Sequence, residues 1–256
     1  MRDIKKEILE KLEEIEAREN VKVLYAVESG SRAWGVESPD SDYDVRFIYM
    51  RPGEDYLRLD EPRDIIEWQL DDVLDINGWD IKKTLIQFHR GNATLFEWAN
   101  SPVVYKSSGI WEGIYGDCRQ YFSVKAALCH YYGTAKGTYE QYLTQEQVRY
   151  KKYIYALRPL LACKYVDENG TVPPVRFQEL LEQKLDGGLY GEIMRMLEIK
   201  AQSDEKALNP RMRLIHKYIE DELGKYGALS RTVREDRNPD WNVLNSIYRR
   251  ICAGWS

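Results

Sequence analysis

The hydrophobic period changes along this chain, and the change limits the folds open to it. Val21 to Val27 and Tyr43 to Met50 are rich in β-branched and aromatic residues, which predicts two strands. A third extended stretch covers 64–69, and a short run around 73–76 is predicted to stop at Asn77-Gly78. From about residue 107 onward helical spacing replaces these signals. The pattern therefore predicts an α+β fold.

The helical segments divide the chain further. Apolar residues at three- and four-residue spacing predict a helix over 3–18, and Asp80 has the position of a cap for a second helix. Further helices are predicted at 119–142, 145–166, 175–185, 189–201 and 209–225, whereas the tail after 227 gives no clear signal. We expect a small mixed-sheet domain over 1–106 and an all-helical domain over 107–256 that completes the substrate cleft.

Several protein classes do not fit the composition of these 256 residues. No apolar run is long enough to span a bilayer, and the charged N-terminal pattern lacks the apolar core of a signal peptide, so we expect a cytoplasmic protein without membrane contact. The four cysteines form no C-x-x-C pair and the three histidines have no partner at helical spacing. A zinc site and a disulfide-linked partner are therefore not expected.

The charge is unevenly distributed. The formal net charge of −5 argues against a protein that coats nucleic acid through bulk charge. Residues 1–142 carry 18 Lys and Arg against 26 Asp and Glu, whereas residues 143–256 carry 19 against 16. An acidic first part could hold cations and a mildly basic second part could hold an anionic ligand.

An Asp-x-Asp motif opens the second predicted strand. Asp42 and Asp44 would share one face there, and two adjacent carboxylates repel unless a cation lies between them, which suits Mg²⁺ or Mn²⁺. An EF-hand loop starting at Asp40 fails, because Val45 replaces its glycine and Arg51 its glutamate. An aspartyl-phosphate enzyme does not fit either, because here the apolar run follows the carboxylates. A purely structural Asx turn remains open.

A second motif lies a dozen residues upstream. Gly30-Ser31 follows a strand and could begin a helix whose N–H groups and hydroxyl hold a phosphate, although no Walker A Gly-Lys-Ser/Thr follows. The whole stretch, GSRAWGVESPDSDYDVRFIY, resembles the DNA polymerase β nucleotidyltransferase superfamily. It is most similar to the predicted nucleotidyltransferase family associated with RNA ligase and RNA repair, over residues 24–49 and more loosely through 105.

The resemblance implies a third carboxylate on an adjacent strand. Asp75 lies in the short extended run, and in related families the third aspartate precedes the helix cap by five residues, which again gives Asp75. Asp72 and then Asp80 are the reserve choices, with Asp80 better used as a cap.

Two later segments also resemble this family. Residues 92–105 match an "EW…SP…Y" stretch, in which Glu97 is either a positioning residue or a surface glutamate. Lys151, Tyr155 and Arg158 share one helix face that could neutralise a triphosphate and stack a base. Solvated lysine stems and core tyrosines would explain the same pattern.

The resemblance implies a metal-dependent nucleotidyltransferase that moves a nucleoside monophosphate from a nucleoside triphosphate to an acceptor, which could be RNA. Asp42, Asp44 and Asp75 would be the catalytic and metal-binding residues, with Mg²⁺ or Mn²⁺ as cofactor. The substrate-binding set would be Gly30, Ser31, Arg32, Ser41, Arg46, Lys151, Tyr155 and Arg158. A non-catalytic nucleotide- or RNA-binding relative and an antitoxin-like regulatory partner are the alternatives.

Overall fold

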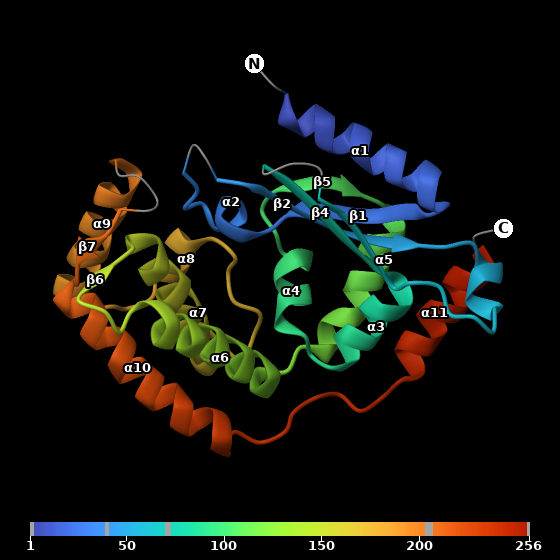
Figure 1. Cartoon of the computed structure of the whole chain (residues 1–256). Helices are drawn as coiled ribbons and strands as arrows, with labels where there is room; N and C mark the ends of the chain where they lie inside the picture. Colours follow the sequence, from blue (N-terminus) through green and yellow to red (C-terminus); the bar gives the residue numbers. More distant parts are fainter. Residues whose placement is uncertain (1–2, 39–40, 70–72, 203–206, 255–256) are drawn as a thin grey trace. The chain divides into compact units, whose positions relative to one another are not determined.

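The computed structural model describes residues 3–38, 41–69, 73–202 and 207–254, and the chain forms two compact units (Figure 1). The first unit comprises residues 1–122 together with 237–256, and the second comprises 123–236. The architecture is α+β, as the sequence predicts. The first unit thus extends past the predicted boundary at 106–107, and it also includes the C-terminal segment 237–256. A division of function between the two parts remains a prediction.

A five-stranded sheet in the order β3-β4-β2-β1-β5 forms the centre of the first unit. Its strands are β1 (Lys22–Glu28), β2 (Tyr43–Met50), β3 (Ile65–Gln69), β4 (Leu74–Asp80) and β5 (Val104–Ser107). β2 and β4 run parallel, and the other neighbours are antiparallel. The sheet is therefore mixed, and β2 lies at its middle.

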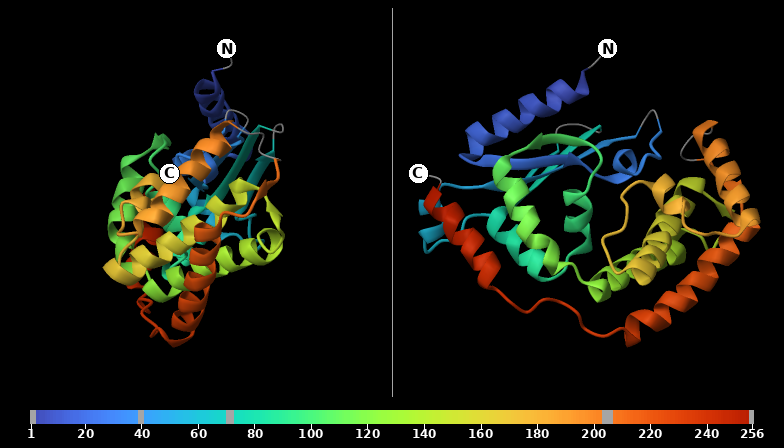
Figure 2. Two further views of the ribbon diagram at one scale, coloured as in Figure 1. Left: turned by 90° about the vertical axis from the view of Figure 1, so that its left-hand side faces the viewer. Right: turned by 180° about the vertical axis from the view of Figure 1, so that it is seen from behind.

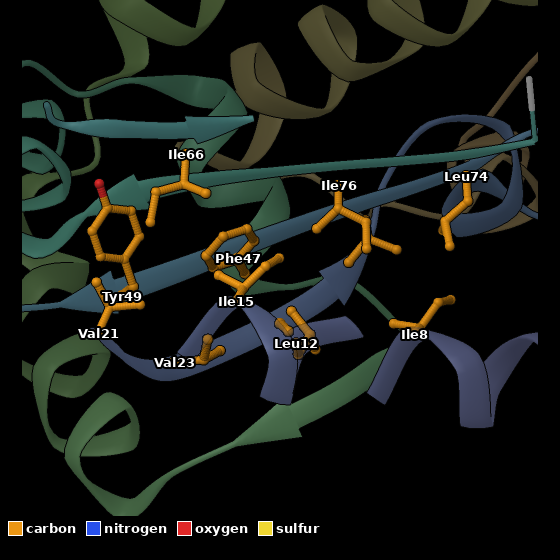
Figure 3. Close-up of a cluster of buried hydrophobic side chains, with 12 residues drawn as sticks. Ile8, Leu12, Ile15, Val21, Val23, Phe47, Tyr49, Ile66, Leu74 and Ile76 are labelled. Atoms are coloured by element: carbon orange, nitrogen blue, oxygen red, sulfur yellow. The ribbon is translucent and has the colours of Figure 1, made fainter. Parts of the chain in front are cut away.

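One face of the sheet is covered by α1 (Ile4–Glu19), whose N-cap Asp3 accepts from the Lys6 backbone N–H. Figure 3 shows the apolar side of this helix, with Ile8, Leu12 and Ile15, against side chains from β1, β2, β3 and β4. All three helix residues are at most 1% exposed. The three- and four-residue spacing in the sequence thus predicts the helix correctly and identifies its buried side.

The opposite face packs against α3 (Ile81–His89), α4 (Ala93–Ala99) and α5 (Gly109–Cys118) (Figures 1 and 2). Aromatic contacts join the layers: Tyr25 stacks on Trp111 at 4.7 Å and Trp79 lies 4.4 Å from Trp98 between ring centroids. Asp80 caps α3 as predicted, because its side chain accepts from the Lys82 N–H. Because helices cover both faces of the sheet, we expect the functional residues at the strand ends and in the loops.

The prediction that the 73–76 run stops at Asn77-Gly78 is wrong. β4 continues through both residues to Asp80, and Gly78 pairs with Phe47 across the parallel ladder. A Cβ atom at position 78 would overlap the Phe47 ring, so the glycine permits close approach of an aromatic side chain. An Asn-Gly pair is typical of a turn, and the local sequence does not distinguish a turn from a strand in which the glycine permits such a contact.

The second unit is built mainly from helices. They are α6 (Val124–Tyr142), α7 (Tyr150–Asn169), α8 (Phe177–Leu181), α9 (Gly187–Gln202) and α10 (Arg213–Thr232). A two-residue ladder joins β6 (Gln147–Val148) to β7 (Asn209–Pro210). The predicted helical segments are confirmed, although their ends differ by several residues, and the short ladder was not predicted.

The C-terminal segment, in which no clear pattern was found, contains α11 (Asn242–Gly254). This helix packs against α3, α5 and the 3₁₀ turn η1 (Gly53–Leu57), so it belongs to the first unit. Its buried residues are Leu244, Ile247 and Ile251. In the part of the chain that the structure describes, no helix combines the length and the apolar character needed to cross a membrane.

Candidate active site

Asp44 and Asp75 lie directly beside each other on the two parallel strands. The register pairs Asp44 of β2 with Asp75 of β4, so both side chains leave the same face of the sheet. Their side chains are 34% and 44% exposed, which leaves both carboxylates open to a ligand. The two residues that the sequence places on separate strands are thus brought together.

One cationic nitrogen contacts both carboxylates. Arg46 Nη2 lies 3.0 Å from Asp44 Oδ1 and 2.9 Å from Asp75 Oδ2. Arg46 Nη1 donates to the backbone oxygens of Val45 at 3.0 Å and Asp75 at 3.4 Å. The Arg46 side chain is only 18% exposed and is therefore less accessible than the two aspartate side chains it joins. It occupies the position of a cation shared by the pair.

Burial and like charges act on Asp44. Loss of solvent contact raises the pKa of its carboxyl group above the usual value, and the charges of Asp75 and Asp42 add to this effect, whereas Arg46 opposes it. Asp42 itself is exposed and precedes the first residue of β2. The structure therefore brings Asp42 within electrostatic reach of Asp44, but outside the strand in which the sequence analysis placed it.

Gly30 and Ser31 begin α2 (Gly30–Trp34), as predicted, directly after β1. Gly30 has a φ of +61°, and a Cβ atom there would overlap Asp44 Oδ2. Ser31 is 8% exposed. The glycine lets the start of this short helix approach the Asp44 carboxylate, which places a candidate phosphate cradle beside the acidic pair.

Two further predicted substrate-binding residues, Arg32 of α2 and Ser41, stabilise the connection between α2 and β2. Arg32 Nη2 donates to the Ser41 carbonyl at 2.6 Å and Nε to the Asp42 carbonyl at 3.1 Å. The Arg32 guanidinium also lies 3.7 Å from the centroid of the Tyr43 ring. The Ser41 hydroxyl, in turn, accepts from the Ser38 N–H at 2.9 Å. Both residues thus position the loop that carries Asp42, and contact with substrate stays a prediction for each.

Sequence reasoning missed Glu28, which lies 1% exposed at the end of β1. Its carboxylate accepts from the Asp44 N–H at 2.7 Å and from the Tyr105 hydroxyl, and its backbone oxygen accepts from Ser101 Oγ at 2.6 Å. Burial raises the pKa of this carboxyl group. The signal in the sequence was a glutamate at the end of an apolar strand, just before Gly30-Ser31. The contacts of this glutamate with Ser101 and Tyr105 explain why the "SP…Y" stretch lies next to the site.

Lys151, Tyr155 and Arg158 all lie on α7 in the second unit. Arg158 is 3% exposed, and its Nε donates to the Val175 carbonyl at 3.2 Å. Lys151 and Tyr155 are partly buried. The structure gives Arg158 a contact inside the helical unit, and a role of these three residues toward substrate stays a prediction.

Of the two reserve carboxylates, only Asp80 is described, and it does not join the pair. Asp72 lies outside the described residues. Asp80, 3% exposed, lies at the other end of β4, where Tyr56 donates to Oδ2 at 2.9 Å and the Lys82 N–H to Oδ1 at 2.7 Å. Glu97 is a partly buried residue of α4. Of the choices for the third carboxylate that are described, only Asp75 lies beside Asp44.

The donor set suits a hard divalent cation. Carboxylate oxygens are the ligands that Mg²⁺ and Mn²⁺ prefer, and the Arg46 nitrogen, which contacts both Asp44 and Asp75, is a stand-in for such an ion. As the described side chains are oriented, no three of the His, Cys, Asp and Glu residues gather into a group that could hold a metal ion. The pair alone therefore fits a shared cation, and a third ligand requires movement of Asp42 or a ligand from substrate.

The chain is nucleotidyltransferase-like and belongs to the polymerase β superfamily. The model of the RNA repair pathway DNA polymerase beta family matches residues 4–250, so the chain belongs to that family. The resemblance detected in the sequence is thereby confirmed.

Two similar proteins extend the comparison. The uncharacterized protein YcgL of Bacillus subtilis (strain 168) is 37% identical over 246 residues, which is 95% of each chain. A nucleotidyltransferase-like protein from Exiguobacterium sibiricum 255-15, known from a crystal structure, is 12% identical with a TM-score of 0.32, over 90% of this chain and 75% of that one.

Proposed function

We propose that this protein is a nucleotidyltransferase that moves a nucleoside monophosphate from a nucleoside triphosphate to an acceptor and releases pyrophosphate, with Mg²⁺ or Mn²⁺ as cofactor. The observation that carries the proposal is the single cationic nitrogen shared by Asp44 and Asp75, beside the start of α2. Membership of the family supports the reaction class.

Asp44 and Asp75 would hold the divalent cation, with Asp42 as the third ligand. When bound, the cation supplies Lewis acidity at the transferring phosphoryl group and neutralises its charge. Ser31 and the backbone at Gly30 would bind the terminal phosphates of the triphosphate, because a helix start offers N–H groups and a hydroxyl to an anion.

The transfer itself is an in-line displacement. An acceptor oxygen forms a bond to the α-phosphorus, the bond from that phosphorus to the bridging oxygen breaks, and pyrophosphate leaves with the bonding electrons. If the acceptor is a hydroxyl, its proton passes to the Asp75 carboxylate, which is 44% exposed and therefore accessible. Arg46 adds positive charge at the site, which stabilises the charge that develops on the phosphoryl oxygens.

RNA is the acceptor that we propose. The support is the association of the family with an RNA repair pathway, together with the slight excess of Lys and Arg over residues 143–256. A 3′ hydroxyl or a terminal phosphate would suit the displacement equally.

Transfer of labelled nucleotide tests the proposal. Purified protein is incubated with each α-labelled triphosphate, Mg²⁺ or Mn²⁺, and total RNA, and both pyrophosphate release and label on RNA are measured. Asp44→Asn and Asp75→Asn should lose activity by at least about 100-fold, because each removes a charge from the shared cation site. Asp60→Asn is the matched control, since Asp60 is a 76% exposed surface partner of Arg58.

Activity that survives undiminished in both site variants would refute the assignment. Binding of triphosphate and Mg²⁺ without pyrophosphate release would favour the non-catalytic relative. Label on the protein itself, with none on RNA, would keep the reaction class and change the acceptor.

A further inference from the structure

The Arg46 guanidinium lies between two of the proposed metal-binding residues, Asp44 and Asp75, rather than beside them. Its Nη2 contacts both Asp44 and Asp75, and its Nη1 is tied to the Val45 and Asp75 backbone oxygens. Both Nη nitrogens therefore donate to groups at the Asp44–Asp75 pair. Because the position that one nitrogen fills is the position that a shared divalent ion needs, the two cations exclude each other.

The reason for this arrangement lies in the charges of the strand pair. Asp44 and Asp75 are register partners on adjacent strands, and like charges placed directly opposite destabilise a sheet. Asp42 adds a third negative charge within electrostatic reach of Asp44. Arg46 supplies a counter-ion from the chain itself, which offsets the repulsion between the carboxylates when no other cation is bound. Its planar guanidinium is suited to joining two carboxylates.

We propose that Arg46 is a competing internal cation that occupies the Asp44–Asp75 pair at rest and must leave it before a divalent metal ion can bind. The inference rests on the proposed function, because it takes these carboxylates as the metal site. Arg46 is thus a positioning residue that sets the affinity and timing of metal binding.

The phosphate oxygens of the triphosphate would accept hydrogen bonds from the displaced Arg46 guanidinium. Arginine forms strong charge-assisted hydrogen bonds with phosphate oxygens, and Ser31 would hold such oxygens at the start of α2, next to Asp44. Metal and triphosphate should therefore bind cooperatively: the nucleotide draws Arg46 away, and the metal takes the vacated pair. By thermodynamic linkage the effect is reciprocal.

Binding of Mn²⁺ alone, followed by electron paramagnetic resonance at pH 8 without nucleotide, tests the competition directly. Wild type should bind weakly, because only the fraction of molecules with Arg46 displaced is competent. Arg46→Met should bind at least about tenfold more tightly, as expected if less than about a tenth of wild-type molecules are competent. Arg46→Lys, which keeps a competing charge, should stay close to wild type.

Arg58→Met is the matched control. Arg58 also contacts two aspartates, Asp55 and Asp60, but on the surface and 51% exposed. This variant removes the same charge and one arginine bridge without touching the site, so its Mn²⁺ affinity should equal that of wild type.

A measurement on the unaltered protein covers the case in which Arg46→Met does not fold. Nitrogen-15 NMR of the arginine side chains should show the Arg46 Nη protons as slowly exchanging without metal, since both nitrogens are hydrogen-bonded. Saturating Mg²⁺ should abolish that protection. Protection that persists at saturation would overturn the proposal.

The outcomes separate the two claims. Equal Mn²⁺ affinity in wild type and Arg46→Met, with binding lost in Asp44→Asn, overturns the competition and leaves the proposed function standing. No Mn²⁺ binding in wild type or Arg46→Met at millimolar metal overturns the proposed metal site and the competition with it.

Discussion

A methyl group at Gly30 should damage the site far more than it damages the fold. Gly30 has a φ of +61°, which costs an alanine roughly 1–2 kcal/mol of folding free energy. The added Cβ would also overlap Asp44 Oδ2 and lie 3.2 Å from Asp44 Cγ, whereas carbon atoms pack favourably at about 3.5–4.0 Å. Because the atom that must yield is the end of a side chain, the carboxylate moves by on the order of 1 Å and the backbone need not.

Gly35 supplies the control for this substitution. It ends the same helix α2, has a φ of +71°, and a Cβ atom there meets nothing within 4 Å. Gly35→Ala therefore carries the backbone strain of Gly30→Ala without the contact to Asp44. The difference between the two variants isolates displacement of the carboxylate.

Urea unfolding and two functional assays would be run on both variants. The unfolding free energies should fall by similar amounts, about 1 kcal/mol once the lower entropy of the unfolded alanine chain is counted. Mn²⁺ affinity of Gly30→Ala should be about 10–100-fold weaker than that of Gly35→Ala, and nucleotide transfer about 100-fold slower. Equal metal affinity and equal transfer in the two variants would contradict the reasoning.

Three further predictions concern the framework of the protein. Burial raises the pKa of Asp80 to about 6, above the usual value of an aspartate, so the folded state binds this proton more tightly than the unfolded state, and stability falls as pH rises from about 4 to 6. Relative to Asp80→Asn, wild type should lose on the order of 3 kcal/mol between pH 4 and pH 7, measured by urea unfolding; a pH-independent difference would refute it. Gly78→Ala should lower the unfolding free energy by roughly 1–3 kcal/mol, because the methyl group overlaps the buried Phe47 ring, and an unchanged melting temperature would argue against that packing. Arg158→Met should cost roughly 1–3 kcal/mol of stability through the lost hydrogen bond to the Val175 carbonyl, whereas a stable variant with weakened triphosphate binding would support the substrate role instead.

Features that depend on local sequence were predictable. The apolar spacing of α1, the strand β2 and the cap at Asp80 each depend on a few adjacent residues, and the structure has all three. The start of α2 at Gly30 followed from a glycine-serine pair after a strand. Local periodicity and capping decide such elements before tertiary contacts are considered.

Features that depend on distant partners were not predictable in the same way. The continuation of β4 through Gly78 depends on the Phe47 ring, which lies on another strand. The bridging position of Arg46 requires the parallel register of β2 and β4. Glu28 acquires its role only from its contacts with Asp44 and Tyr105. In each case the deciding interaction joins residues far apart in sequence.

The proposed reaction depends above all on a divalent cation that Asp44 and Asp75 share beside the start of α2. Anomalous scattering from crystals grown with Mn²⁺ and a non-hydrolysable triphosphate analogue tests it most directly. We expect a manganese peak at about 2.1 Å from carboxylate oxygens of both residues, with the Arg46 guanidinium turned toward phosphate. A manganese ion bound elsewhere, with Arg46 still joining the two carboxylates, would contradict it.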